Sequence, residues 1–202
     1  RFAEEEAKHQ QLFWRYCAAF ERDFGHKCHR LGTAADVAHV ILGKSALGVT
    51  LMTLHFELMT QAHYTESVRG HQNLDPLFCD LLRHHWMEEA QHARLDALEI
   101  DKLLEGTSPE QIGACFGDYI DVLDIFDGLL LTQSKFDLQT LSGALGKTFS
   151  ETDAHAIVAS QHAAYRNTFL VSGMTNRSFE EIVKTISRTA ADRIAAKAAE
   201  LR

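Results

Sequence analysis

The sequence predicts an all-α protein that folds as a bundle of helices. Apolar residues recur at three- and four-residue spacing, whereas the alternation typical of β-strands is hard to find. The chain has 2 prolines, in Asp75-Pro76 and Ser108-Pro109. In both dipeptides the first residue can cap a helix, and proline at the first helical position sacrifices no hydrogen bond. Each dipeptide therefore marks the start of a helix.

Capping signals and apolar periodicity together define the helices to within a few residues. We expect helices at about residues 2–24, 34–68, 76–105, 109–136, 150–172 and 178–201. The helices expected to begin near residues 76 and 109 open with the two prolines. The last two open with sequences that resemble capping boxes, namely Ser150-Glu151-Thr152-Asp153 and Ser178-Phe179-Glu180-Glu181.

The length of 202 residues suits one domain with its own core and is short for two. We therefore expect a single helical domain over residues 1–202. In it, residues 1–105 supply the central bundle helices, and residues 109–202 pack against them as additional C-terminal helices.

The composition excludes several classes of protein. A hydrophobic fraction of 46% and a charged fraction of 24% are typical of soluble globular chains. The net charge of -8 argues against binding nucleic acid, which needs clustered Lys and Arg. Lys44, His55 and Glu57 interrupt the longest apolar stretch, so we expect no membrane span. The 4 cysteines lack CxxC spacing, which favours a reducing cytoplasm.

One pentapeptide occurs almost twice, as Glu-Glu-Ala-Lys-His at residues 5–9 and Glu-Glu-Ala-Gln-His at residues 88–92. Glutamate and histidine three residues apart share one helix face, so both can bind one metal ion. About one Glu-x-x-His sequence is expected by chance in a chain with this many Glu and His residues. The repeat alone is therefore weak evidence.

The position of the second motif on its helix is more informative. At about 100° per residue, His85, Glu89, His92 and Asp96 fall in the middle of the apolar stripe that must face the core. Glu88 falls outside that stripe, so we expect Glu89 to be the metal ligand. The apolar members of the stripe are Phe78, Leu81, Leu82, Ile100 and Leu103.

The other two helices of the first half also place acidic groups among apolar ones. On the first helix, Glu6 and His9 share a sector with aromatic residues, whereas Glu4 and Glu5 point elsewhere. Glu57 lies inside an apolar run, where a lone carboxylate would be costly to bury. The apolar members of the first sector are Phe2, Phe13, Cys17, Phe20 and Phe24.

Two simpler readings compete with a metal site. These could be ordinary surface residues, or they could form a buried salt-bridge network with Lys or Arg. The network reading fails on counting, because the core sectors contain three carboxylates and three histidines but no evident Lys or Arg. Two divalent cations would balance that charge. Carboxylate and imidazole ligands without thiolate suit iron or manganese.

With these motifs, residues 1–105 resemble the ferritin-like dimetal-carboxylate proteins. In that family, successive bundle helices supply Glu, Glu-x-x-His, Glu and Glu-x-x-His. Glu6 with His9 matches the second helix, Glu57 the third, and Glu89 with His92 the fourth. The resemblance implies that the first helix, with its carboxylate, precedes residue 1.

His85 narrows the resemblance. The sequence His85-x-x-x-Glu89-x-x-His92 is similar to that of diiron enzymes of the p-aminobenzoate N-oxygenase type, which oxidise arylamines. The resemblance implies a site of two iron ions, with manganese and iron as a variant, that activates dioxygen and oxidises a small organic amine. It further implies an external electron donor and is compatible with a homodimer.

Other functions remain open at this stage. The same ligands would serve a diiron oxidase or desaturase acting on an acyl chain, or a ferritin-like protein that binds iron without catalysis. A helical scaffold with a coincidental Glu/His face is a further alternative. Metal stoichiometry would separate these readings.

Weaker signals mark residues around the motifs. Asp96, one turn beyond the last motif, could accept a hydrogen bond from a ligand ring N–H or pair with an Arg. Thr53, Thr60 and Tyr64 lie on the same side of their helix as the buried glutamate and are candidates for lining a substrate pocket. Buried threonines more often bond backbone carbonyls.

Further along the chain, aspartates recur every third residue. As a solvated or capping series they need no function, although one of them could replace the carboxylate of the preceding helix. His155 and His162 share a face but lack a Glu at ligand spacing, which favours a packing role. The aspartates are Asp118, Asp121, Asp124 and Asp127.

Overall fold

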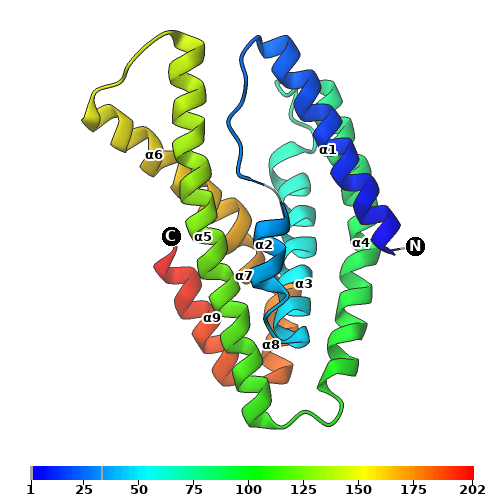
Figure 1. Ribbon diagram of the computed structural model, residues 1–202. Helices are drawn as coiled ribbons and strands as arrows, with labels where there is room; N and C mark the ends of the chain where they lie inside the picture. The colour runs from blue at the N-terminus through cyan, green and yellow to red at the C-terminus, as the bar shows by residue number, and fades with distance from the viewer. Residues whose placement is uncertain (1, 33) are drawn as a thin grey trace.

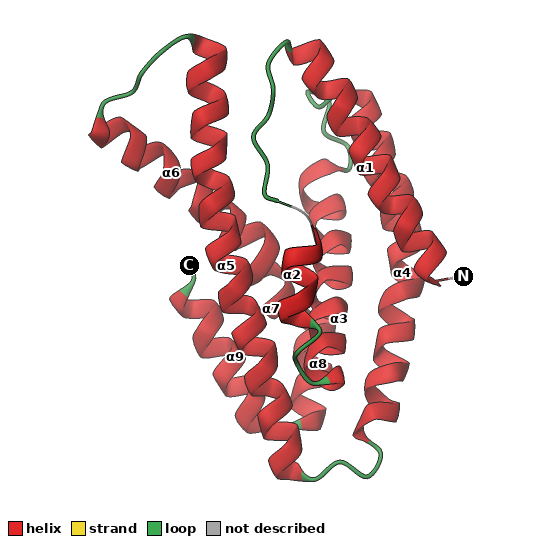
Figure 2. Ribbon diagram, viewed as in Figure 1, coloured by secondary structure: helices red, strands yellow, loops and turns green. Residues whose placement is uncertain are grey.

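The computed structural model describes residues 2–32 and 34–202, and within them it is helical without strands, which confirms the all-α prediction (Figures 1 and 2). Two short π-helices, η1 and η2, continue α3 and α6. The elements are α1 (Phe2–Phe24), α2 (Ala34–Ile41), α3 (Ala46–His63), η1 (Tyr64–Val68), α4 (Pro76–Leu104), α5 (Pro109–Leu145), α6 (Glu151–Tyr165), η2 (Arg166–Val171), α7 (Ser172–Met174), α8 (Arg177–Ile186) and α9 (Arg188–Glu200).

The helix starts expected at the two prolines are confirmed. Asp75 caps α4, and its carboxylate accepts a hydrogen bond from the backbone N–H of Phe78 at 2.8 Å. Ser108 caps α5 and forms a complete capping box with Gln111. Each cap satisfies backbone donors that the first turn of a helix would otherwise leave unpaired.

Two of the expected helices are broken. The helix expected at residues 34–68 is divided, because α2 ends at Ile41 and α3 begins after Ser45. The helix expected at residues 178–201 is divided at Ser187, whose extended backbone has φ −158° and ψ 114°. The serine at each break caps the helix that follows, so the new helix replaces the backbone bonds lost at the break.

Two other helix ends differ from expectation. The helix expected to end near residue 136 continues as α5 to Leu145 and stops at Gly146, whose φ of 58° is left-handed and favours glycine. The helix expected at residues 150–172 changes at Arg166 from α-helix into the π-helix η2. The wider turns of η2 then lead into α7.

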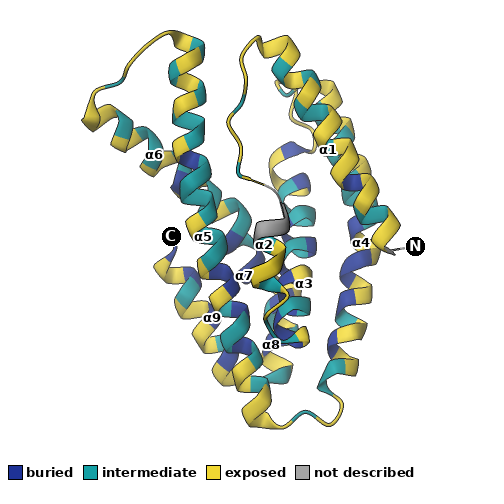
Figure 3. Ribbon diagram, viewed as in Figure 1, coloured by how far each residue is buried: buried dark blue, intermediate teal, exposed yellow. Residues whose placement is uncertain are grey.

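The core surrounds α3, which packs against α4, α5, η2, α7 and α8. Figure 3 shows buried residues concentrated on the facing sides of these helices, with the exposed residues outside. The largest fully buried apolar side chains come from six different elements and include Leu51, Ile100, Phe116, Leu170, Met174 and Phe179.

His55 lies at the centre of this core. Its Nε2–H donates to the backbone carbonyl of Phe169 at 2.9 Å, and its Nδ1 accepts from the Tyr119 hydroxyl at 2.8 Å. Burial lowers the pKa of His55 to about 4, so the ring is neutral. The backbone at Gly173 packs directly on the ring, and a methyl group there would collide with the imidazole. His55 therefore joins α3 to α5 and η2.

Helix α1 is the least embedded of the long helices. It lies along the outer side of α4 (Figure 1) and contacts it through Tyr16, whose ring is 5.6 Å from that of Phe78. The outer face of α1 carries exposed apolar side chains, among them Trp14 at 64% exposure. Phe20 and Phe24, expected on the core face, stack on each other at 5.3 Å and are themselves exposed. The side chain of Phe2 lies outside the described residues.

Candidate metal centre

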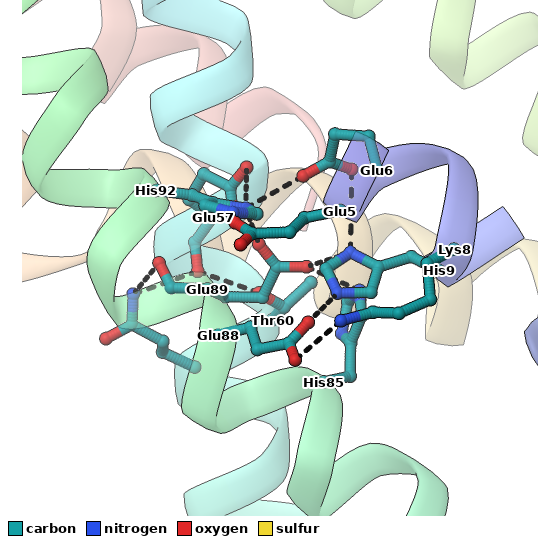
Figure 4. Close-up of polar contacts among 11 residues, drawn as sticks. Glu5, Glu6, Lys8, His9, Glu57, Thr60, His85, Glu88, Glu89 and His92 are labelled. Atoms are coloured by element: carbon teal, nitrogen blue, oxygen red, sulfur yellow. Dashed lines mark hydrogen bonds and ion pairs between the residues drawn. The ribbon is translucent and has the colours of Figure 1, made fainter. Parts of the chain in front are cut away.

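The two copies of the pentapeptide face each other across the contact between α1 and α4 (Figure 4). The first copy occupies the first two turns of α1, and the second lies near the middle of α4. Helix α3 passes behind both and adds Glu57. The three helices therefore bring together residues that are more than eighty positions apart in the chain.

Four side chains form the centre of this cluster. His92 Nδ1 is 2.8 Å from Glu6 Oε1 and 2.9 Å from Glu89 Oε2. His9 Nδ1 is 3.6 Å from Glu6 Oε2 and 3.2 Å from Glu89 Oε1. One ligand atom from each of the four residues lies within 4.8 Å of every other. Both carboxylates thus span the same two imidazoles, one oxygen toward each ring.

Glu57 and His85 lie at the edges of the four. Glu57 Oε1 is 4.0 Å from His92 Nδ1, and the carboxyl group forms a hydrogen bond with Glu89. His85 Nε2 donates to Glu89 Oε1, and its ring packs edge-on against that of His9 at 4.5 Å. The sequence assigned all these residues to one site, and the structure brings them together.

Two carboxylates of the cluster, Glu57 and Glu89, are buried against each other. Burial raises the pKa of Glu57, and the hydrogen bond with Glu89 and its negative charge raise it further. Burial alone would raise the pKa of Glu89 too, but hydrogen bonds from His85 and from the Glu57 acid hold it below its ordinary value. Without a cation, Glu57 therefore keeps a proton and Glu89 does not.

The donor set fits a bound cation. Oε1 of Glu6 and Nδ1 of His9 are buried and form no well-aligned hydrogen bond with the described residues, although both face the interior of the cluster. In the described part of the chain, no Lys or Arg forms an ion pair with Glu6, Glu57 or Glu89. Buried carboxylates and imidazole nitrogens of this kind are the ligands that iron and manganese accept.

Asp96 and Thr53 lie next to the cluster. Asp96 follows His92 by one turn of α4, and Thr53 precedes Glu57 by one turn of α3. Asp96 is 8% exposed, its Oδ2 has no hydrogen-bond partner in the described residues, and burial raises the pKa of its carboxyl group. The neighbouring Thr53 side chain opposes that shift, although its hydroxyl donates to the backbone carbonyl of Thr50 at 2.9 Å. Neither of the partners considered for Asp96, a ring N–H of His92 or an Arg, forms a hydrogen bond with it among these residues.

The other two candidate pocket residues lie further from the ligands. The Thr60 hydroxyl donates to the backbone carbonyl of Glu57 at 2.8 Å, as buried threonines commonly do. Tyr64 packs against Trp86 at 5.1 Å and lines a shallow hollow that includes Arg83. None of the clustered Glu and His residues lines that hollow.

Two glutamates that the sequence placed outside the site contact its histidines. Glu88 Oε2 lies 2.7 Å from Nε2 of His9, and Glu5 Oε2 lies 3.2 Å from Nε2 of His92. The expectation that Glu5 points elsewhere was wrong, because a glutamate at the edge of a helix face can extend across to its neighbour. Both copies of the motif begin with two glutamates, and this doubling was the signal in the sequence.

The aspartates of α5 all lie outside the cluster and pair with basic groups. Asp118 and Asp121 contact Lys44, and Asp124 lies 2.8 Å from Lys197. None of the four therefore supplies the additional carboxylate that the resemblance implies. Asp127 binds both the guanidinium of a neighbouring arginine and the buried His162. His155 is exposed.

Comparisons with known proteins add no relative. No protein-family model matches the chain, and neither a curated protein nor a solved structure does. Among the described helices, none combines the length and apolar character needed to cross a membrane. The functional argument therefore depends on the cluster itself.

Proposed function

We propose that this chain is a diiron oxygenase, which uses dioxygen to oxidise a small organic substrate. The reaction its motif resembles is N-oxygenation of an arylamine. The observation that supports the proposal is the convergence of two Glu-x-x-His motifs and the buried Glu57 on one point where, among the described residues, no Lys or Arg pairs with Glu6, Glu57 or Glu89. A structural ion-pair network would contain basic side chains.

The arrangement of the oxygens favours two cations over one. Glu89 directs Oε1 toward His9 and His85 and directs Oε2 toward His92. Glu6 likewise directs one oxygen toward each of the two motif histidines. Carboxylates that span two imidazole positions are suited to bridging a pair of ions.

In the proposed site, Glu6, His9, Glu89 and His92 hold the irons, and Glu57 and His85 complete the set. Bound iron would supply the open coordination positions and the electrons that dioxygen activation requires. Three ionised carboxylates and neutral imidazoles leave a pair of divalent ions close to electrically balanced. Metal binding must release the proton from Glu57 and free the Nδ1 atoms of the histidines.

The protein contributes position and exclusion of water. His92 is 1% exposed and Glu89 is 2% exposed, so bulk water does not reach these two ligands. For an amine, one oxygen atom of dioxygen enters an N–H bond to give a hydroxylamine, and the other leaves as water. That balance consumes two protons and two electrons, which the external reductant supplies.

The test begins with metal content. Protein loaded anaerobically with ferrous iron should retain two irons per chain and consume dioxygen in the presence of a reductant and 4-aminobenzoate. The hydroxylamine product is identified by mass spectrometry with labelled dioxygen. Glu89→Gln should lose both metal and turnover, whereas the exposed control Glu99→Gln should keep both.

The other functions give different results in the same assays. Two irons without amine oxidation, but with oxidation of an acyl chain, would identify an oxidase or desaturase. Many irons per chain would identify an iron store. His85→Ala should weaken metal retention if that imidazole is a ligand. Failure to bind iron with native folding would reject the proposal altogether.

A further inference from the structure

A groove lies among the last three helices of the fold, α7, α8 and α9, which pack against one another (Figure 1). Its volume of about 730 Å³ is within the range of small-molecule binding sites. None of the residues that line it belongs to the Glu/His cluster. The groove is therefore separate from the candidate metal centre, and nothing described so far gives it a role.

The floor of the groove is apolar. Alanines recur along its α9 wall at every fourth residue, and their short side chains leave the space between the helices open. These alanines are Ala191, Ala195 and Ala199. Buried apolar side chains from all three helices, each at most 3% exposed, also line the groove, and they include Met174, Phe179, Val183 and Ile194. An occupant with an apolar body would gain free energy by displacing water from this floor.

The rim of the groove carries more basic than acidic side chains. Lys184, Arg188 and Arg202 line it and are exposed, and the acidic residues of the lining are Glu180 and Asp192. Lys184 pairs with Glu180 at 2.6 Å, whereas Arg188 forms no ion pair with a carboxylate of the described residues. The guanidinium of Arg188 is therefore available to an anion at the mouth of the groove.

Charge and surface character favour a small anion over a protein as the occupant. Residues 177–202 contain six Lys or Arg and four Asp or Glu, a net charge of +2 in a chain whose net charge is -8. This segment therefore attracts anions more than the rest of the chain does. None of the large apolar side chains exposed in the described chain lies on α7, α8 or α9. A docking protein would need such side chains at the surface, whereas a small molecule can reach the floor of the groove.

We propose that the groove between α7, α8 and α9 binds a small organic anion with an apolar body, of the class of medium-chain carboxylates. The apolar body lies on the floor, and the Arg188 guanidinium donates hydrogen bonds to the carboxylate at the rim. The proposal does not rest on the proposed function, because the groove and the Glu/His cluster share no residue.

The experiment uses the full chain, labelled with ¹³C at its methionine methyl groups and titrated with octanoate in the presence of a chelator. Met174 lines the groove, whereas Met87 on α4 is 52% exposed and reports binding to exposed apolar surface. We expect a saturable NMR shift at Met174 and none at Met87. Hexanoate, which is two methylenes shorter, should bind about 15-fold more weakly if both methylenes are buried.

Two pairs of variants test the apolar and the basic parts of the groove separately. Ala195→Leu fills the groove and should abolish the shift at Met174, whereas Ala196→Leu, exposed on the same helix outside the lining, should leave it unchanged. Arg188→Gln should weaken octanoate binding about 5-fold, and the exposed control Arg193→Gln should not. Circular dichroism confirms that each variant is folded, and the arginine pair decides the test if Ala195→Leu is not.

Three results would overturn the proposal. Octanol or octylamine binding as tightly as octanoate would show that the groove does not select an anion. Equal shifts at Met87 and Met174, or equal effects of the two alanine substitutions, would show binding without a site. A concentration-dependent dimer that Ala195→Leu abolishes would assign the groove to a second copy of the chain. Iron content and dioxygen consumption test the oxygenase proposal independently of all three.

Discussion

Replacing Glu57 by Gln should stabilise the metal-free protein. The Glu57 side chain is 12% exposed, and burial with the adjacent Glu89 raises its pKa from 4.5 to above neutrality. The folded chain therefore keeps a proton at pH 7 that the unfolded chain releases. Holding that proton costs about 3 kcal/mol at pH 7, taken as 1.36 kcal/mol per pH unit above the ordinary value. Gln mimics the protonated acid and removes this cost.

The sign of the pH dependence follows from the same shift. A raised carboxyl pKa means that the folded state binds more protons, so the contribution of Glu57 to stability is most favourable below pH 4.5 and is lost as the pH rises. Glu57→Gln should therefore be about equal to wild type at pH 4 and more stable by up to about 3 kcal/mol at pH 7. Urea denaturation in the presence of a chelator measures both values.

With metal the difference in stability between wild type and Glu57→Gln should close. Wild type should gain about 3 kcal/mol when the free metal concentration is 100-fold above the dissociation constant, and Glu57→Gln should gain much less. The exposed control Glu99→Gln should follow wild type in both conditions. The reasoning fails if Glu57→Gln is less stable than wild type in chelator, or if it keeps the full metal-dependent gain.

The remaining predictions concern packing, charge and the attachment of α1. Gly173→Ala should destabilise the protein by about 1–3 kcal/mol, because the added methyl collides with His55, whereas Gly143→Ala on α5 has open space and should be neutral or stabilising in thermal melts. Equal effects would contradict the close packing at α7. Asp127→Asn should cost about 2 kcal/mol at pH 7 by weakening its two bonds with Arg166 at 2.6 Å. Because those bonds lower the pKa of Asp127, the difference should vanish in denaturation well below pH 3.8, and persistence there would contradict it. Backbone amides of α1 should exchange more slowly with metal than with chelator, whereas those of α5 should not change, and unchanged α1 exchange would argue against metal-dependent docking.

The periodicity of the sequence was sufficient to predict the all-α fold and the interior residues of the cluster, but not every break and end of the helices. Glu89 and His92 could be assigned because polar residues in the middle of an apolar stripe have few alternatives to a shared site. The same reasoning located Glu57, where a single carboxylate interrupts an apolar run. Whether these groups hold iron stays a prediction.

The periodicity did not predict the contacts that depend on the length of a side chain more than on the direction of its Cβ atom. A helical wheel assigns Glu5 and Glu88 to other faces because it records only where the Cβ atom points. A glutamate has enough rotatable bonds to reach a neighbouring helix from the edge of a face. The neighbour's position becomes known only when the helices are packed, so the contacts of Glu5 and Glu88 between α1 and α4 could not be derived from either helix alone.

Ion pairs between residues that are distant in the sequence could not be predicted either. Asp121 pairs with Lys44 and Asp124 with Lys197, each 73 or more residues away, and no local pattern specifies such pairs. The breaks before α3 and α9, unlike these pairs, do have a local signal. Ser45 and Ser187 are residues that can cap a helix, and both lie within the expected helices. Their ability to start a new helix was visible in the sequence, but continuous apolar periodicity concealed it.

The arrangement of the helices explains why the carboxylates of the cluster, which are costly to bury, lie at the edge of the apolar core. The apolar core is built on α3, α5 and the C-terminal helices, whereas most of the carboxylates of the cluster lie between α1 and α4, at the edge of that core. Glu57 projects into the cluster from the best-packed helix and gives the site a rigid base. Helix α1, by contrast, has a largely exposed outer face and is joined to α4 in part by the same side chains that would bind metal. Repulsion among those carboxylates opposes the docking of α1, and a cation bound between them would favour it. If the proposed site binds metal, metal binding and the attachment of α1 would therefore be one equilibrium, since the site is complete only when α1 is docked.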